Sequence, residues 1–236
     1  MAAVLLGVLA AFCWSLHDVF ARSLAQRIGP FRMAALVMIA GGILLTGIVI
    51  YNGTVWNAST TAIVEGLLLG LAYGFGVGGL FKAFSMAPLS LVAPVTASYP
   101  VLVVVWGVTH GLVPSAIQWA AVAATLTGAV IVARAGTEDG GINTVLPGKL
   151  PALGFFCLLS ALGYAASIVL GQNAALSVGE IEATWLSRAT ALISILPFMI
   201  GERRPANLEI GHWGGIFAMA AFDVVGVIAI NASGHL

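Results

Sequence analysis

Charged residues are scarce in this sequence and make up 8% of its 236 positions. A soluble domain carries roughly 25% charged residues, so this chain has too few of them to cover a surface that faces water. Lys and Arg together number 9, as do Asp and Glu, which gives a net charge of +0. Such a balance excludes the basic face that binds nucleic acid. With 60% hydrophobic residues, most of the surface is expected to face lipid.

Cysteine and the common cofactor motifs are also scarce. Cys13 and Cys157 lie in separate apolar runs, so we interpret them as buried thiols rather than metal ligands. The sequence has no Gly-x-x-x-x-Gly-Lys motif, which argues against a self-contained ATP-driven pump. We therefore expect no metal and no cofactor. No Lys or Arg precedes the first apolar run, which favours a retained helix over a cleaved signal peptide.

Apolar runs long enough to cross a bilayer occupy most of the chain. Short polar breaks separate them, and the most polar stretch, 135–149, lies between two halves of the chain. The pattern predicts an all-α integral membrane protein with about eight transmembrane helices. The expected spans are 2–21, 31–51, 62–84, 89–109, 115–133, 150–170, 183–200 and 211–230.

Lys and Arg are unevenly divided between the two sides that eight spans would create. One side collects only Arg188 of the 9. Basic residues accumulate in cytoplasmic loops, so the crowded side is predicted to be cytoplasmic and both ends of the chain to face outward. The predicted cytoplasmic side holds Arg22, Arg27, Arg32, Lys82, Arg134, Lys149, Arg203 and Arg204.

The two halves resemble each other. Residues 14–17 and 164–167 are each followed by a polar break and an arginine, Arg32 or Arg188, and residues 73–85 resemble 222–234. The offsets are 150, 156 and 149 residues, which indicates a duplicated unit. Because the first half has an odd number of spans, its second copy is expected to enter the membrane inverted. Inverted repeats are a transporter architecture with the substrate site near the midplane.

The order and spacing of several motifs resemble the EamA-type members of the drug/metabolite transporter superfamily. The matching features are Trp14-Ser15, Arg32 at the start of the second span, the aromatic and glycine-rich third span that leads into Lys82-Ala83-Phe84-Ser85, the stretch 87–101 with Pro100, and the stretch from Gln118-Trp119 to Gly128. One departure is Gly111-Leu112, where the family commonly has a Gly-Glu pair.

This resemblance implies a five-plus-five inverted-repeat fold of about ten helices. It assigns residues 1–134 to a first five-helix repeat, 135–149 to a linker and 150–236 to a second repeat with three helices. The last two helices are thus expected to be missing. The resemblance further implies a multi-pass protein of the plasma (inner) membrane that exports small metabolites, amino acids or drugs.

Four glycines mark one face of the third span. Gly66, Gly70, Gly74 and Gly78 recur at every fourth position, which places them on one side of a helix. Small residues at this spacing let two helix backbones approach closely in lipid. We interpret the face as a helix–helix seam, which leaves open whether it also slides during transport.

Three ionisable side chains lie inside apolar runs, where they are costly and usually face a partner or a pathway. His17 and Asp18 precede the end of the first span, and Asp223 lies near the centre of the last. No cation lies near Asp223 in sequence. Because burial disfavours a charged carboxylate, Asp223 is a candidate proton carrier or a counter-ion for a cationic substrate. Structural pairing and solvation at the interface remain alternatives.

Aromatic residues and prolines complete the candidate substrate pathway. Each aromatic alone could equally serve packing or anchoring at the interface; the candidates are Trp14, Tyr73, Tyr99 and Tyr164. Pro94 and Pro100 both fall in the fourth span. Proline removes a backbone hydrogen bond and kinks a helix, so these two are expected to shape the cavity or to relieve packing.

A secondary transporter is the predicted function, and no enzymatic activity is expected. An intramembrane enzyme would need a nucleophile motif or paired metal ligands, and adjacent His17 and Asp18 point to different helix faces. A structural or assembly role, or a truncated transporter without activity, remains an alternative. The expected partners are a small-molecule substrate and the lipid bilayer, with a homodimer left open.

Overall fold

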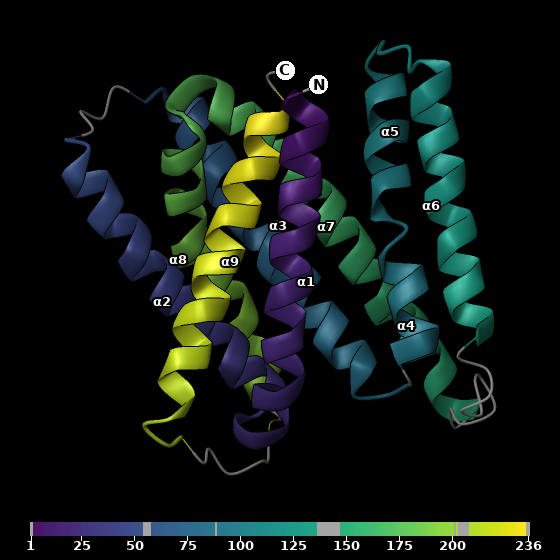
Figure 1. The fold of residues 1–236 in the computed structure, drawn as a ribbon, viewed down its shortest axis with the longest axis horizontal. Helices are drawn as coiled ribbons and strands as arrows, with labels where there is room; N and C mark the ends of the chain where they lie inside the picture. Colours follow the sequence, from purple (N-terminus) through teal and green to yellow (C-terminus); the bar gives the residue numbers. More distant parts are fainter. Residues whose placement is uncertain are drawn as a thin grey trace. The chain divides into compact units, whose positions relative to one another are not determined.

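The computed structural model describes residues 2–53, 58–87, 89–135, 147–200, 202 and 208–234, and all regular elements in these ranges are helical (Figure 1). This confirms the prediction of an all-α membrane protein. The α-helices are α1 (Ala2–Ile28), α2 (Pro30–Tyr51), α3 (Thr60–Phe84), α4 (Leu89–Thr96), α5 (Tyr99–Thr109), α6 (Ala116–Ala135), α7 (Leu150–Val178), α8 (Glu180–Met199) and α9 (His212–Ser233), with a short 3-10 turn, η3 (Pro147–Lys149), before α7.

Within the described residues, 5 helices are both long and apolar enough to cross a membrane. They are Ala2–Ala21, Pro30–Tyr51, Thr60–Phe84, Leu150–Val178 and His212–Ser233, and two shorter apolar stretches are Pro94–Thr109 and Ala116–Ile131. The remaining helix, α8, is more polar because it contains Glu180, Glu182 and Arg188. Glu180 and Glu182 precede the predicted span 183–200, which therefore starts too late in the chain. Both lie in the first turn of α8, where the helix dipole favours acidic side chains.

The predicted span 89–109 is two helices rather than one. α4 ends at Thr96, and α5 begins at Tyr99. Pro100 occupies the first turn of α5, where its missing N–H leaves no hydrogen bond unmade. Pro94 lies inside α4 without ending it. Pro100 therefore marks a break where a kink was expected.

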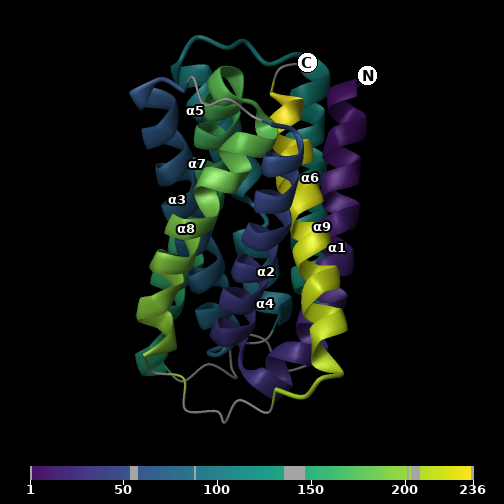
Figure 2. The same ribbon diagram turned by 90° about the vertical axis from the view of Figure 1, so that its left-hand side faces the viewer.

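The helices form two compact units. Unit 1, Met1–Gly74 and Ser167–Leu236, contains α1, α2, most of α3, the end of α7, α8 and α9. In it α9 packs along α1 and α2, while α8 packs along α2 (Figure 2). Unit 2, Phe75–Ala166, contains the rest of α3 and α7 together with α4, α5 and α6, and buries Ala83, Val92, Leu153 and Cys157. Unit 1 combines residues from both predicted repeats, and the assignment of 1–134, 135–149 and 150–236 stays a prediction.

An offset of 150 residues relates the helix boundaries of the two halves. α1 ends at Ile28 and α7 at Val178, and α2 begins at Pro30 and α8 at Glu180. Gly29 and Gly179 form the intervening turns, with φ of 89° and 91°. This offset pairs Arg188 with Met38, not with Arg32, and Tyr73 with Asp223, not with Phe222. Arg188 is the ninth residue of α8 and does not open that helix.

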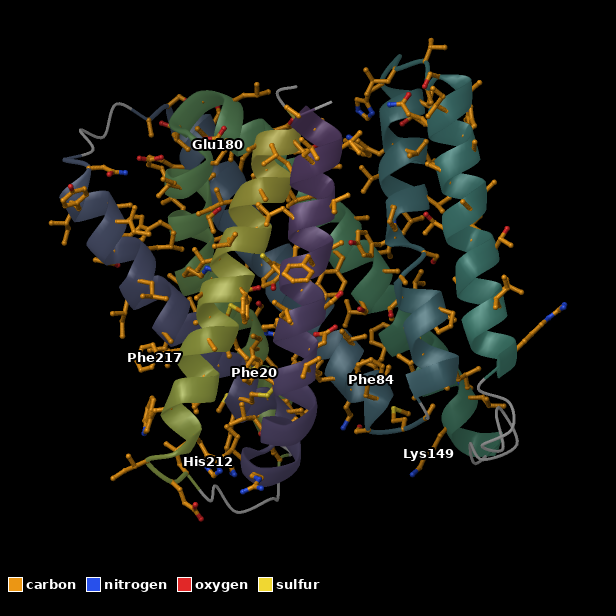
Figure 3. The ribbon with its side chains drawn as sticks, in the orientation of Figure 1. Phe20, Phe84, Lys149, Glu180, His212 and Phe217 are labelled. Carbon is orange, nitrogen blue, oxygen red and sulfur yellow. The ribbon has the colours of Figure 1, made fainter. Side chains whose placement is uncertain are left out.

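Corresponding helices run in opposite directions within unit 1. The backbone N–H of Arg32, near the start of α2, donates to Glu202 Oε2 beyond the end of α8 at 3.1 Å. Trp185, near the start of α8, donates from Nε1 to Thr46 Oγ1 on the second half of α2 at 2.8 Å. α2 and α8 are therefore antiparallel. α8 and α9 also begin at opposite ends of the bundle, as the positions of Glu180 and His212 show (Figure 3).

Replacing Gly29 with alanine should destabilise the fold. Its φ of 89° and ψ of 142° belong to a region that is almost restricted to glycine and costs other residues about 1–3 kcal/mol. A side chain there would also meet Glu202. We expect a lower free energy of unfolding for Gly29→Ala in detergent micelles, measured by equilibrium denaturation. Gly7→Ala is the matched control, because no atom lies within 4 Å of its added Cβ; equal stability of the two variants would contradict the assignment.

Candidate functional site

A buried ion pair lies in the interior of unit 1. Arg188 Nη1 lies 2.6 Å from Asp223 Oδ2, and their side chains are 5% and 1% exposed. Arg188 is the ninth of 20 residues in α8, and Asp223 is the twelfth of 22 in α9. Both charges thus lie near the middle of their helices. Ionised groups at this depth are costly and pair with one another.

Tyr73 on α3 and Met38 on α2 complete a cluster around this pair, which we call the Arg188 cluster: Met38, Tyr73, Arg188 and Asp223. The Tyr73 hydroxyl donates to Asp223 Oδ1, and Arg188 Cζ lies 5.9 Å from the centre of the Tyr73 ring. Arg188 Nη1 also donates to Met38 Sδ at 3.3 Å. Each oxygen of Asp223 therefore has a donor, and the cluster joins α2, α3, α8 and α9.

Within the Arg188 cluster, residues of the first half contact the equivalent residues of the second half. Met38 and Arg188 are 150 residues apart and in contact, and so are Tyr73 and Asp223. When two halves of a chain are related by a two-fold axis, a residue touches its own counterpart only near that axis. Both contacts join residues that the 150-residue offset makes equivalent, as the predicted repeat requires near such an axis.

Several buried donors in unit 1 have no hydrogen-bond acceptor within the described part of the chain. They are Nε and Nη2 of Arg188 and Nε1 of Trp14. The Trp14 indole packs against α9, because a Cβ added at Gly226 would lie 2.9 Å from Trp14 Nε1. In unit 2 the counterpart of this contact, at an offset of 150, joins Gly76 to Tyr164, where an added Cβ would lie 3.1 Å from Tyr164 N. Aromatic residues thus pack on glycine at equivalent places in both halves.

Three of the four glycines on the predicted face of α3 lie against α8. A Cβ on Gly66 would lie 2.8 Å from Leu186 Cδ1, and one on Gly70 would overlap Ser187 O. One on Gly74 would lie 2.5 Å from Ala191 O. Their backbones therefore approach α8 more closely than any larger residue would allow. Gly78, the fourth, is buried and belongs to unit 2.

The remaining candidate residues fall into separate groups. His17 Nδ1 lies 3.1 Å from Asp18 Oδ1 on α1, so these neighbours contact each other although different faces were expected; the Asp18 side chain is 76% exposed and that of His17 15%. In unit 2, Tyr99 and Tyr164 pack with ring centres 5.7 Å apart. The structure thus joins Tyr73 to Asp223 and Tyr99 to Tyr164, each pair within its own unit.

The structure gives Asp223 a partner and corrects the place of Arg188. Asp223 has no cation near it in sequence, but Arg188 pairs with it from α8. Arg188 is not a basic residue of the outer side, since it lies buried in the middle of α8. Arg188 and Met38 were the functional candidates missing from the sequence prediction. A usable signal existed, because an arginine and an aspartate inside predicted membrane spans are expected to pair.

The α3–α8 seam predicts that Gly70 tolerates no larger residue. The Cβ of Gly70→Ala would overlap the backbone oxygen of Ser187, and overpacking of this kind costs about 1–3 kcal/mol. We expect a lower melting temperature for Gly70→Ala in micelles. Gly47→Ala on α2 is the control, because its added Cβ meets no atom within 4 Å. An unchanged melting temperature for Gly70→Ala would contradict the close contact between α3 and α8 at this residue.

The ion pair predicts strong non-additivity between its two partners. Arg188→Met or Asp223→Leu alone leaves one buried charge unpaired, which costs about 3–5 kcal/mol. The double variant leaves no charge and should regain most of this stability. Unfolding free energies of the wild type, both single variants and the double variant provide the measurement. Additive losses in the double variant would contradict the pairing.

Comparison with known proteins gives one match. A family model described as the EamA-like transporter family matches residues 1–134, which is more than half of the chain. No curated protein and no solved structure matches. Within the described residues, no group of three or more His, Cys, Asp and Glu side chains could hold a metal ion. The matched family consists of transporters rather than enzymes. The chain, a multi-pass membrane protein with several spanning helices, belongs to the EamA-like transporter family.

Proposed function

We propose that this chain is a secondary transporter of the plasma membrane that exports small metabolites, amino acids or drugs by alternating access. In this proposal the Arg188 cluster lies on the substrate pathway. The observation that carries it is the buried pair between Arg188 and Asp223, near the middle of α8 and α9. The proposal places this pair on the axis between the two predicted inverted halves. Substrate sites of inverted-repeat transporters occupy this position.

The geometry supports coupling between the site and helix movement. The cluster joins α2 and α3 from the first half to α8 and α9 from the second. Alternating access rocks one repeat against the other around a fixed site. Any such movement would change the Arg188–Met38 and Tyr73–Asp223 contacts, which cross between the halves, so a ligand that altered these contacts would bias the two states.

The same pair also favours a second candidate, a purely structural role. Both oxygens of Asp223 already accept hydrogen bonds from protein donors, and a buried pair can serve to specify one packing arrangement. In that case Asp223 would tie α9 to α8 and α3 without touching any substrate. The two roles differ in what happens to transport when the protein remains folded.

Replacement of Asp223 by asparagine separates these roles. Asn keeps the shape and an acceptor for Tyr73 but removes the charge that pairs with Arg188. In proteoliposomes tested with labelled amino acids and cationic drugs, we expect the Asp223→Asn transport rate to fall at least about tenfold, which corresponds to loss of about 1.4 kcal/mol of stabilisation. Thermal unfolding of the same samples reports whether the variant is folded.

The exposed Glu209 provides the control for removal of a carboxylate charge, and Glu209→Gln should transport at the wild-type rate. A folded Asp223→Asn protein with the wild-type rate and the wild-type pH dependence would remove both the pathway role and the proton-carrier hypothesis for Asp223. It would leave the structural role. Absence of transport by the wild type across the whole panel would count against the transporter itself.

A further inference from the structure

One edge of the Arg188 guanidinium group is buried but unused. Nη1 contacts Asp223 Oδ2 at 2.6 Å and Met38 Sδ at 3.3 Å. Nε and Nη2 are also shielded from solvent, yet neither has a hydrogen-bond partner in the described ranges. Leaving such donors unsatisfied costs more for a charged group than for a neutral one. A buried group of this kind in a native protein calls for a ligand or an ordered water.

The unused edge has a defined chemical preference. The N–H of Nε and one N–H of Nη2 point in the same direction, on the side of the planar group away from Nη1. Their spacing matches the two oxygens of a carboxylate, which can accept both in parallel. Lysine at the same place would offer a compact charge without this fork. The edge is therefore suited to a planar anion that accepts two hydrogen bonds.

Two neighbouring glycines on α2 border Arg188. A Cβ added at Gly41 would lie 3.3 Å from Val224 Cγ2 on α9 and 3.8 Å from Nε and 3.9 Å from Cζ of Arg188, so Gly41 borders both Val224 and the guanidinium group. A Cβ added at Gly42 would instead lie 3.6 Å from Cβ of Arg188, along the aliphatic stem. The absence of a side chain at Gly41 thus keeps a methyl-sized group away from the guanidinium.

We propose that the Nε/Nη2 edge of Arg188 binds the carboxylate group of the transported substrate. This inference rests on the proposed transport function and adds a substrate class to it. Asp223 occupies the Nη1 end of the guanidinium and the substrate carboxylate occupies the opposite edge, so one arginine holds both. Because Asp223 already balances the charge of Arg188, a phosphate dianion would bring more uncompensated charge into this apolar region than a carboxylate would.

Acetate, the small carboxylate probe, tests this site without knowledge of the natural substrate. A ligand that binds the folded state raises the melting temperature. We expect acetate to stabilise the purified wild-type protein in micelles relative to chloride at equal ionic strength, with no stabilisation by the uncharged isostere acetamide. Inorganic phosphate should stabilise the protein less than acetate. Stabilisation by phosphate equal to that by acetate would overturn the choice of carboxylate.

Two variants test the assignment to the Arg188 edge. Arg188→Lys keeps the charge but removes the fork, and Gly41→Ala keeps Arg188 but adds a methyl group against Nε. We expect each to raise the half-saturating acetate concentration at least about tenfold, as for loss of a charge-assisted hydrogen bond. Gly42→Ala adds the same methyl group one residue away, against the stem, and should leave the acetate response within about twofold of wild type.

The outcomes separate this inference from the transport function. If acetate fails to stabilise the wild type, or stabilises Gly41→Ala as well as Gly42→Ala, the edge holds water and the carboxylate site is wrong. Should Arg188→Lys not fold, the comparison of Gly41→Ala with Gly42→Ala still decides. Transport of cationic drugs without any acetate binding would overturn only the carboxylate site. Acetate binding at Arg188 without transport of any compound would overturn only the transport function.

Discussion

The pairing of Arg188 with Asp223 is the constraint on which the arrangement of unit 1 depends. Lipid offers little hydrophobic driving force between apolar helices, so directional contacts must define which faces meet. A distance of 2.6 Å between Nη1 and Oδ2 allows only a narrow range of rotations and shifts of α8 against α9. Tyr73 and Met38 extend the same restriction to α3 and α2. One polar cluster therefore orients four helices, while the surrounding apolar side chains supply close packing.

Composition and local pattern were enough to predict the all-helical membrane fold, since low charge and long apolar runs are properties of the chain itself. They were not enough to predict the break between α4 and α5. Pro94 and Pro100 look alike in sequence, yet only Pro100 starts a new helix. The first turn of α8, which begins at Glu180, was also not predicted, because acidic residues are common both in loops and in first helical turns.

The candidate site was only partly predictable for a related reason. Asp223 and Tyr73 were recognisable as a polar and an aromatic residue inside apolar helices, but their partner Arg188 was counted as a loop charge. Residues 35 and 150 positions apart are joined by tertiary packing, which no local pattern reports. The predicted repeat had inconsistent offsets because apolar residues substitute for one another freely. Gly29 and Gly179 would align the halves, but they are 2 of 29 glycines, and their positive φ, which Gly53 and Gly111 share, is known only from the structure.

The glycines at the helix interfaces are distributed unequally between the two halves. In one interface Gly74 of α3 meets Ala191 of α8, and in its counterpart Val224 of α9 meets Gly41 of α2. In both contacts the glycine belongs to the first half and the larger residue to the second. A transporter with identical inverted halves would have inward-facing and outward-facing conformations of equal free energy, since a two-fold rotation that exchanges the repeats converts one into the other. Unequal side-chain volumes at equivalent contacts remove this equality. We therefore expect the chain to prefer one of the two conformations even when no substrate or ion gradient is applied.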